Sequence, residues 1–267
     1  MSKPKCIPVI FYHHVSPYLD IHPSVFEKQI EYLSLKGYSA ITLYELRNFM
    51  LYGAINVSKP VVITFDDGYY DNYAFAYPIL RKFNFKGTIF VITSRIKDKR
   101  ECKVDFENES YNNKNNPDNF ITWEEAKEMV ESGVIDIQSH THLHYRDGKS
   151  WEKVADMDIK QDLILSKKMI ESKTKKTCDF ICWPWGRYDE YMIEMAKSAG
   201  YKGCLTTKTG SNFFGGDVYR INRINIWKND ERWFKNRMKI YSNAFLSRFY
   251  SGFYGIDRKI KRILKIL

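Results

Sequence analysis

Short apolar runs alternate along this chain with longer stretches whose apolar positions recur at helical spacing. The apolar runs predict strands at residues 7–12, 39–42, 60–65, 87–93, 134–138, 178–183, 202–206 and 222–227. The stretches between them predict helices at residues 24–36, 43–51, 71–84, 122–132, 152–172, 188–199 and 230–241. Strands that alternate with helices indicate parallel βα units, and roughly eight such strands favour a barrel.

Two segments interrupt this alternation. Residues 96–119 have little apolar content and are predicted to form a surface loop, either over an active-site mouth or as a tolerated insertion. Beyond residue 241 the chain becomes basic, so we divide it into a barrel domain at 1–241 and an amphipathic tail at 242–267.

The end of the tail, residues 256–267, has the pattern of a basic amphipathic helix. Its apolar face consists of Ile256, Ile260, Ile263, Leu264 and Leu267. Its cationic face consists of Arg258, Lys259, Lys261, Arg262 and Lys265. Such a helix either lies on an anionic membrane surface or packs on the barrel, and the pattern favours neither.

Composition narrows the class of protein and its compartment. At 267 residues and 44% hydrophobic content, the chain is long enough for one barrel domain. The net charge of +10 favours an anionic surface or substrate, but no segment resembles a nucleic-acid module, so we expect no nucleic-acid partner. The five cysteines form no Cys-x-x-Cys pair, and neither a signal peptide nor a membrane span is evident. We therefore expect a cytoplasmic protein with reduced thiols.

Two adjacent carboxylates, Asp66 and Asp67, end the β-branched run at residues 61–65 and precede Gly68. Neighbouring carboxylates at a buried strand end repel each other unless a cation or hydrogen bonds compensate. Taken alone, the tripeptide is more typical of a solvated turn.

Three of the six histidines, His140, His142 and His144, lie within five residues directly after a predicted strand. Imidazoles are the commonest nitrogen ligands of zinc and similar metals. Because active sites of βα barrels are built at the carboxyl ends of the strands, metal binding is favoured over chance clustering.

A third stretch, Trp183-Pro184-Trp185-Gly186, follows the predicted strand at 178–183. Pro fixes one backbone dihedral and Gly permits an unusual one, so this turn can present a backbone N–H beside an aromatic wall. Alone, it is more typical of a strand-to-helix connection with core tryptophans.

In combination these motifs resemble those of the polysaccharide deacetylases, carbohydrate esterase family 4, which includes chitooligosaccharide deacetylases. Residues 64–68 and 140–144 resemble the first two motifs of the family, and residues 183–186 resemble a variant of the third. Tyr12-His13 is similar to the Tyr-His pair of a subgroup, the poly-N-acetylglucosamine deacetylases. The resemblance covers about residues 7–227 and implies a distorted α/β barrel, a (β/α) barrel of seven or eight strands.

The resemblance also implies a divalent metal. Asp67, His140 and His144 would be its ligands, and Asp66 would be the base that takes a proton from the metal-bound water as this attacks. Zinc is the first expectation, and nickel, cobalt or iron suit the same ligands. The backbone N–H of Trp185 would hold the oxyanion of the tetrahedral intermediate.

The general acid has to come from an unusual place. Most family members supply it from a Leu-x-x-His motif near the C-terminus, but no histidine follows His144 here. Following the Tyr-His subgroup, we assign His13 as the general acid, because strand alternation turns His14 to the other face.

The arginine that usually precedes the third-motif Pro is missing as well. We expect Arg223 to replace it as the partner that keeps Asp66 ionised, with Arg187 and Arg220 as the competing candidates.

These residues together predict metal-dependent hydrolysis of the N-acetyl group of an amino sugar, in a glycan or a lipid-linked saccharide. The lipid-linked substrate would place the protein peripherally on the inner face of the membrane, through residues 256–267. Two alternatives remain: a metal-dependent hydrolase of another amide or formyl substrate, and a non-catalytic, membrane-attached carbohydrate-binding protein.

Overall fold

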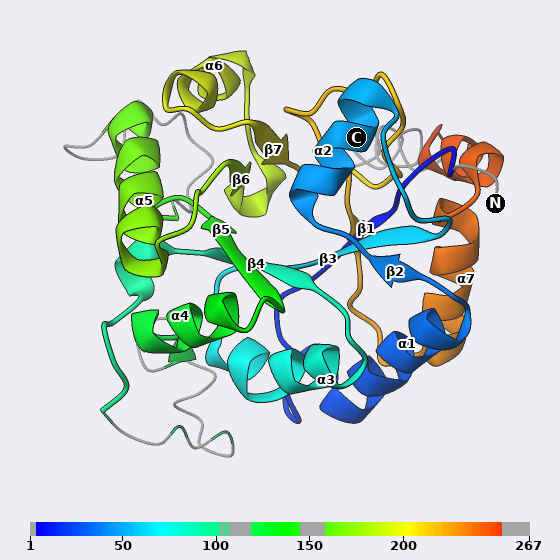
Figure 1. Ribbon diagram of the computed structural model, residues 1–267, viewed down its shortest axis with the longest axis horizontal. Helices are drawn as coiled ribbons and strands as arrows, with labels where there is room; N and C mark the ends of the chain where they lie inside the picture. The colour runs from blue at the N-terminus through cyan, green and yellow to red at the C-terminus, as the bar shows by residue number, and fades with distance from the viewer. Residues whose placement is uncertain (1–3, 102–103, 105, 107–118, 145–157, 253–267) are drawn as a thin grey trace, which may run out of the picture.

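The computed structural model describes residues 4–101, 104, 106, 119–144 and 158–252, and shows a sheet of parallel strands surrounded by helices (Figure 1). The strands are β1 (Val9–Tyr12), β2 (Ser39–Ala40), β3 (Pro60–Phe65), β4 (Gly87–Val91), β5 (Ile135–Ser139), β6 (Phe180–Cys182), β7 (Gly203–Leu205) and β8 (Ile224–Asn225). The α-helices are α1 (Pro23–Leu35), α2 (Leu43–Tyr52), α3 (Tyr77–Lys82), α4 (Trp123–Glu131), α5 (Ile159–Thr174), α6 (Glu190–Ser198) and α7 (Glu231–Tyr241). Shorter helical turns are η1 (Asn72–Ala76), η2 (Thr93–Arg95) and η6 (Pro184–Gly186).

The sheet curves into a distorted barrel. Its strands follow the order β7-β6-β5-β4-β3-β1-β8, with β2 beside β3, and all of these pairs are parallel. The segment just before β8 closes the barrel against β7, because Ile221 N donates to Cys204 O at 2.9 Å. The residue just after β8 continues the pairing with β1, because Ile226 N donates to Phe11 O at 3.0 Å. The predicted (β/α) barrel of seven or eight strands is confirmed.

Two apolar layers explain why the strands are apolar on both faces. Outward side chains such as Ile10 and Ile63 pack in one cluster with the helices. Inward side chains such as Val9 and Val62 form a second cluster, together with Leu46 and the other buried residues of α2. Because both faces are covered, every residue of β3 is buried and the strand reads as a continuous apolar run.

The predicted elements agree closely with the observed ones, with one change of type. The stretch predicted as a helix at residues 71–84 begins with the π-helical turn η1 and becomes α-helical only at α3. Pro78 at the start of α3 has no N–H to donate, and Tyr77 N donates instead to Asn72 O five residues back. The helix predicted at 152–172 is observed as α5, and residues 152–157 lie outside the described part of the chain.

The tail is described only as far as residue 252. Residues 244–252 are helical and pack on the barrel: Ser247 Oγ donates to Ser211 Oγ at 2.9 Å, and the Arg248 guanidinium lies 4.6 Å from the Phe213 ring centre. The amphipathic pattern at 256–267 and most of the loop at 96–119 lie outside the described residues, so both stay predictions. Of the helices that the structure describes, none has the length and apolar character that a bilayer crossing requires.

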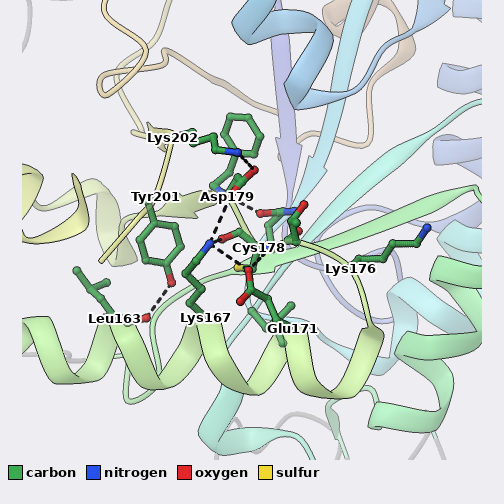
Figure 2. A network of polar contacts seen from close by, with 12 residues as sticks. Leu163, Lys167, Glu171, Lys176, Cys178, Asp179, Tyr201 and Lys202 are labelled. Carbon is green, nitrogen blue, oxygen red and sulfur yellow. Dashed lines mark hydrogen bonds and ion pairs between the residues drawn. The ribbon is translucent and has the colours of Figure 1, made fainter. Parts of the chain in front are cut away.

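A network of charges ties α5, β6 and β7 together around Asp179 (Figure 2). The buried Asp179 carboxylate accepts hydrogen bonds from Lys202 Nζ at 2.8 Å and Tyr44 OH at 3.1 Å, and pairs with Lys167 Nζ at 3.4 Å. Lys167 also pairs with Glu171 at 3.1 Å, whose carboxylate accepts from the backbone of the residue before Asp179. The network lies at the amino ends of the strands, since Asp179 directly precedes β6.

Asp136, on the neighbouring strand β5, is a carboxyl group in this region whose ionisation destabilises the folded protein. Burial, together with the nearby Asp179 charge, raises the pKa of Asp136 from 3.8 to about 6. The folded protein therefore disfavours the ionised carboxylate, and stability decreases as the pH rises from the unfolded pKa to the folded one.

We expect Asp136→Asn to stabilise the protein by about 1–3 kcal/mol at neutral pH and by clearly less near about pH 4.5. Asn keeps an oxygen that can accept from Gln138 Nε2, so the hydrogen-bonding pattern survives. Urea unfolding at both pH values measures the difference, with the exposed Glu131→Gln as control. An equal effect of Asp136→Asn at both pH values would contradict the assignment.

Candidate active site

Polar side chains gather at the carboxyl ends of four strands, β1, β3, β5 and β6. Asp66 and Asp67 directly follow β3, and His140 directly follows β5. His13 directly follows β1, and Trp185 lies in the η6 turn after β6. Parallel strands end at the same edge of the barrel, which is why segments far apart in the sequence meet here.

Three of these side chains converge as metal ligands do. His140 Nε2 lies 3.2 Å from Asp67 Oδ1, and His144 Nε2 lies 3.3 Å from the same oxygen. The three ligand atoms all lie within 4.8 Å of one another. Burial alone would raise the pKa of Asp67, but hydrogen bonds from the two imidazoles outweigh it and hold that pKa well below its usual value. The predicted trio is therefore brought together around an anionic carboxylate.

The donor set fits a divalent cation. His140 Nδ1 lies 2.8 Å from the backbone oxygen of Cys182 and donates to it, so Nε2 is the nitrogen that would bind a cation once it has lost its proton. Two imidazole nitrogens and one carboxylate oxygen form a set that zinc and similar metals accept, with positions left for water and substrate.

The histidine-bearing turn is strained and held from below. Thr141 and His144 have left-handed backbones, with φ of 69° and 48°. His144 N donates to Thr141 Oγ1 at 3.1 Å, so Thr141 orients a ligand. The fully buried Asp162 of α5 accepts from His142 N at 2.8 Å on one oxygen and from Leu143 N at 2.9 Å on the other.

Asp66 lies beside this trio and is paired with Arg223. Arg223 Nη1 donates to Asp66 Oδ1 at 2.6 Å, and Nη2 donates to Oδ2 at 2.8 Å, with both side chains buried. Burial raises the pKa of Asp66, but the Arg223 charge and hydrogen bonds outweigh it, so the pKa is lowered. The structure thus places Arg223 where the missing motif arginine was expected to act, while Arg220 pairs with Glu190 at the surface.

The two adjacent histidines that follow β1 point in different directions. His13 is half-buried, and its ring lies edge-on to that of Phe11, with the ring centres 5.7 Å apart. The Arg223 guanidinium that pairs with Asp66 lies 4.1 Å from the centre of the same Phe11 ring. His14 is buried, with Nδ1 2.6 Å from Asp71 Oδ2 and its ring 3.8 Å from that of Tyr69. His13 therefore faces the reacting groups, whereas His14 is part of their support.

Trp185 lies on the other side of the trio. Its backbone is left-handed, with φ of 60°, and its ring centre lies 6.2 Å from that of His144. The following Gly186 is also left-handed, and a Cβ there would lie 2.0 Å from Thr207 Oγ1. Only glycine permits this turn, which presents the Trp185 ring to solvent.

Two carboxylates that support the site, Asp71 and Asp162, and the hydrogen-bonding role of Cys182 were not predicted from the sequence. Asp71 and Asp162 lie in helical stretches where an acidic residue is ordinarily solvated, so no local signal marks them. Cys182 serves through its backbone oxygen, and its Sγ lies 3.7 Å from Asp66 Oδ2. A backbone acceptor leaves no trace in residue type.

The site belongs to a region of the chain that matches known proteins. Residues 55–204 match the polysaccharide deacetylase family. The Bacillus subtilis protein YxkH is 30% identical over 84% of this chain and 73% of its own length. A poly-beta-1,6-N-acetyl-D-glucosamine N-deacetylase of Staphylococcus aureus is 30% identical over 77% of this chain and 67% of its own length. The chain spans only 32% of the Escherichia coli protein of the same name.

The fold is also that of solved structures. The Streptococcus pyogenes deacetylase PplD, in complex with acetate, aligns with a TM-score of 0.71 at 24% identity. The alignment covers 88% of this chain and 98% of that one.

We expect Arg223→Met to lower the free energy of unfolding by about 3–5 kcal/mol, because Asp66 is left buried without its counter-charge. The double variant Asp66→Asn/Arg223→Met loses less, because both charges are then absent. Urea unfolding of the two single variants and the double variant measures the coupling. Additive losses would contradict a dominant Asp66–Arg223 interaction.

We expect Asp162→Asn to weaken divalent-metal affinity by about tenfold or more, because an amide offers one acceptor oxygen for two backbone N–H groups. Competition with a chelating dye measures the affinity. Asp158→Asn, at the N-cap of the same helix, is the matched control. Unchanged affinity in Asp162→Asn would show that the turn holds its shape without this carboxylate.

Proposed function

Because the chain belongs to the polysaccharide deacetylase family, whose members are metal-dependent hydrolases, we propose that it removes acetyl groups from N-acetylglucosamine units of a polysaccharide. The convergence of Asp67, His140 and His144 beside an ionised Asp66 carries this proposal. The sugar is inferred from the Staphylococcus aureus and Escherichia coli relatives, whose names specify poly-beta-1,6-N-acetyl-D-glucosamine.

We propose zinc as the metal, held by Asp67, His140 and His144. A cation there supplies a Lewis acid that lowers the pKa of a water molecule and polarises the acetyl carbonyl. His140 donates to the backbone oxygen of Cys182, and the backbone N–H of His144 donates to Thr141 Oγ1. These two hydrogen bonds orient the imidazoles toward Asp67.

Asp66 acts as the general base. Its carboxylate stays ionised at neutral pH because Arg223 stabilises the charge, and it takes the proton of the water that attacks the carbonyl carbon. The backbone N–H of Trp185 donates to the oxyanion that develops on the carbonyl oxygen. The left-handed turn at Trp185 sets the direction of that N–H.

His13 protonates the departing nitrogen. As the C–N bond breaks, the amine leaves with a proton from His13, and the acetyl group leaves as acetate. The His13 ring contacts Phe11, which packs against the Arg223 partner of Asp66, and the His13 backbone oxygen accepts from Asn72 Nδ2 at 3.0 Å, which holds the end of β1 in place.

A lipid-linked saccharide is the second substrate to test, because the net charge of +10 favours an anionic carrier. Its proposed membrane contact through residues 256–267 lies outside the described residues, and a cytoplasmic location at the inner membrane face stays a prediction.

We expect the protein to release acetate from β-1,6-linked N-acetylglucosamine oligomers in the presence of zinc, and Asp66→Asn to release none, because the amide cannot accept the proton. Enzymatic detection of acetate measures both, with lipid-linked forms and formylated amines as parallel substrates. If the wild type holds zinc but yields no acetate, the site serves another amide substrate or sugar binding without catalysis.

We expect His13→Ala to lower kcat by about 100-fold or more, because the amine then leaves without a proton donor. His14→Ala is the matched comparison, and we expect it to retain most of kcat while unfolding at lower urea concentration. A folded His13→Ala protein with full turnover, or the reverse order of the two variants, would move the general acid elsewhere.

A further inference from the structure

Two exposed residues, Asn225 and Trp227, lie at the end of the last barrel strand and just beyond it. β8 pairs with β1 in parallel, with Ile224 opposite Ile10 and Asn225 opposite Phe11. The pairing continues one residue further, because Ile226 N donates to Phe11 O at 3.0 Å. Continued two residues past β8, the same register would bring Trp227 level with His13.

The alternation of the strand shows which way these side chains face. Ile224 and Ile226 are buried in the layer between strands and helices. Arg223 points to the opposite, inward face, where it pairs with Asp66. Asn225 has the same strand parity as Arg223 but is exposed, so it lies where the inward face opens to solvent, on the Asp66 side of the strand. Trp227 follows two positions later, just beyond the strand, and is also exposed.

The Trp227 ring is held in place while 57% of the residue stays exposed. It contacts Trp233 of α7 edge to face at 6.1 Å, and Lys228 Nζ lies 4.8 Å from its centre. The loop after β1 is tied to the same segment, because Asn229 accepts from His22 N and donates to Asp20 O, both at 2.8 Å. A ring fixed from behind and open in front loses little entropy when it binds a ligand.

Exposed aromatic residues on loops that follow strands of the described barrel include Tyr18, Trp185 and Trp227. Tyr18 is 55% exposed and follows β1, and Trp185 is 56% exposed and follows β6. Of these three, Trp185 lies against the histidines, with its ring centre 6.2 Å from that of His144. Aromatic rings combined with a few polar groups are typical of ligand sites, and the C–H face of a pyranose packs on an indole.

We propose that Trp227 and Asn225 bind the sugar unit next to the one being deacetylated, with the pyranose face on the indole and its hydroxyls on the Asn225 amide. This inference rests on the proposed function for its orientation, since the sugar that loses its acetyl group has its nitrogen at His13. The chain of sugars then continues from His13 toward β8. The site takes a neutral saccharide of at least two units.

The test compares Trp227→Ala, Trp227→Phe and Asn225→Ala on β-1,6-linked N-acetylglucosamine oligomers of one to five units. We expect Trp227→Ala to raise KM for the pentamer about tenfold with little change in kcat, and to leave the monomer unaffected. Trp227→Phe restores most of the pentamer affinity, and Asn225→Ala gives a smaller increase in KM. Tyr52→Ala, which removes an exposed ring at the end of α2, is the matched control.

A binding measurement separates this inference from the proposed function. The pentamer is titrated by calorimetry into chelator-treated Asp66→Asn protein, with and without Trp227→Ala. Weaker binding in the Trp227→Ala protein supports the subsite even if the wild type releases no acetate. Equal pentamer affinity with and without the indole, or no binding of the pentamer to either protein, overturns it.

Discussion

The ion pair between Arg223 and Asp66 is the interaction on which the rest of this molecule depends. Both groups are buried, so each charge would be strongly disfavoured without the other. The pair joins the segment before β8 to the end of β3 across the intervening β1, on the inward face of the sheet. The ionised state of Asp66 therefore depends on a residue 157 positions away that the fold brings to the same face of the sheet.

Unusual backbone conformations are concentrated where the chemistry lies. Asp67, Thr141, His144 and Trp185 all have positive φ, although none is glycine. Each costs on the order of 1–2 kcal/mol, and such conformations persist only where the surroundings over-determine them. Here the close-packed strands before each turn, and the Asp162 carboxylate beneath the histidines, supply that constraint. These strained conformations direct the proposed metal-binding side chains and the backbone N–H of Trp185 toward one point.

Much of the fold was predictable because it is local in origin. The apolar runs of β3 and β4 and the helical periodicity of α1 and α7 are visible in the sequence itself. The predicted bounds of these four elements are close to the observed ones. The first part of the segment predicted as an α-helix at 71–84 is instead the π-helical turn η1. That turn depends on a hydrogen bond near Pro78, which the hydrophobic periodicity does not reveal. β8 is shorter than predicted because only Ile224 and Asn225 pair regularly with β1.

The reactive groups are evident from the residue pattern alone: two adjacent carboxylates, a histidine cluster and a Trp-Pro-Trp-Gly turn, each at the end of an apolar run. Their types and short spacings are local properties, which a linear pattern preserves. The distant hydrogen-bond partner of each group depends on the tertiary structure: Arg223 for Asp66, the Cys182 carbonyl for His140 and Asp162 for the histidine turn. These contacts join residues 20 to 157 positions apart. They arise because parallel strands end at one edge of a closed sheet, a constraint that acts through space and leaves no periodicity along the chain.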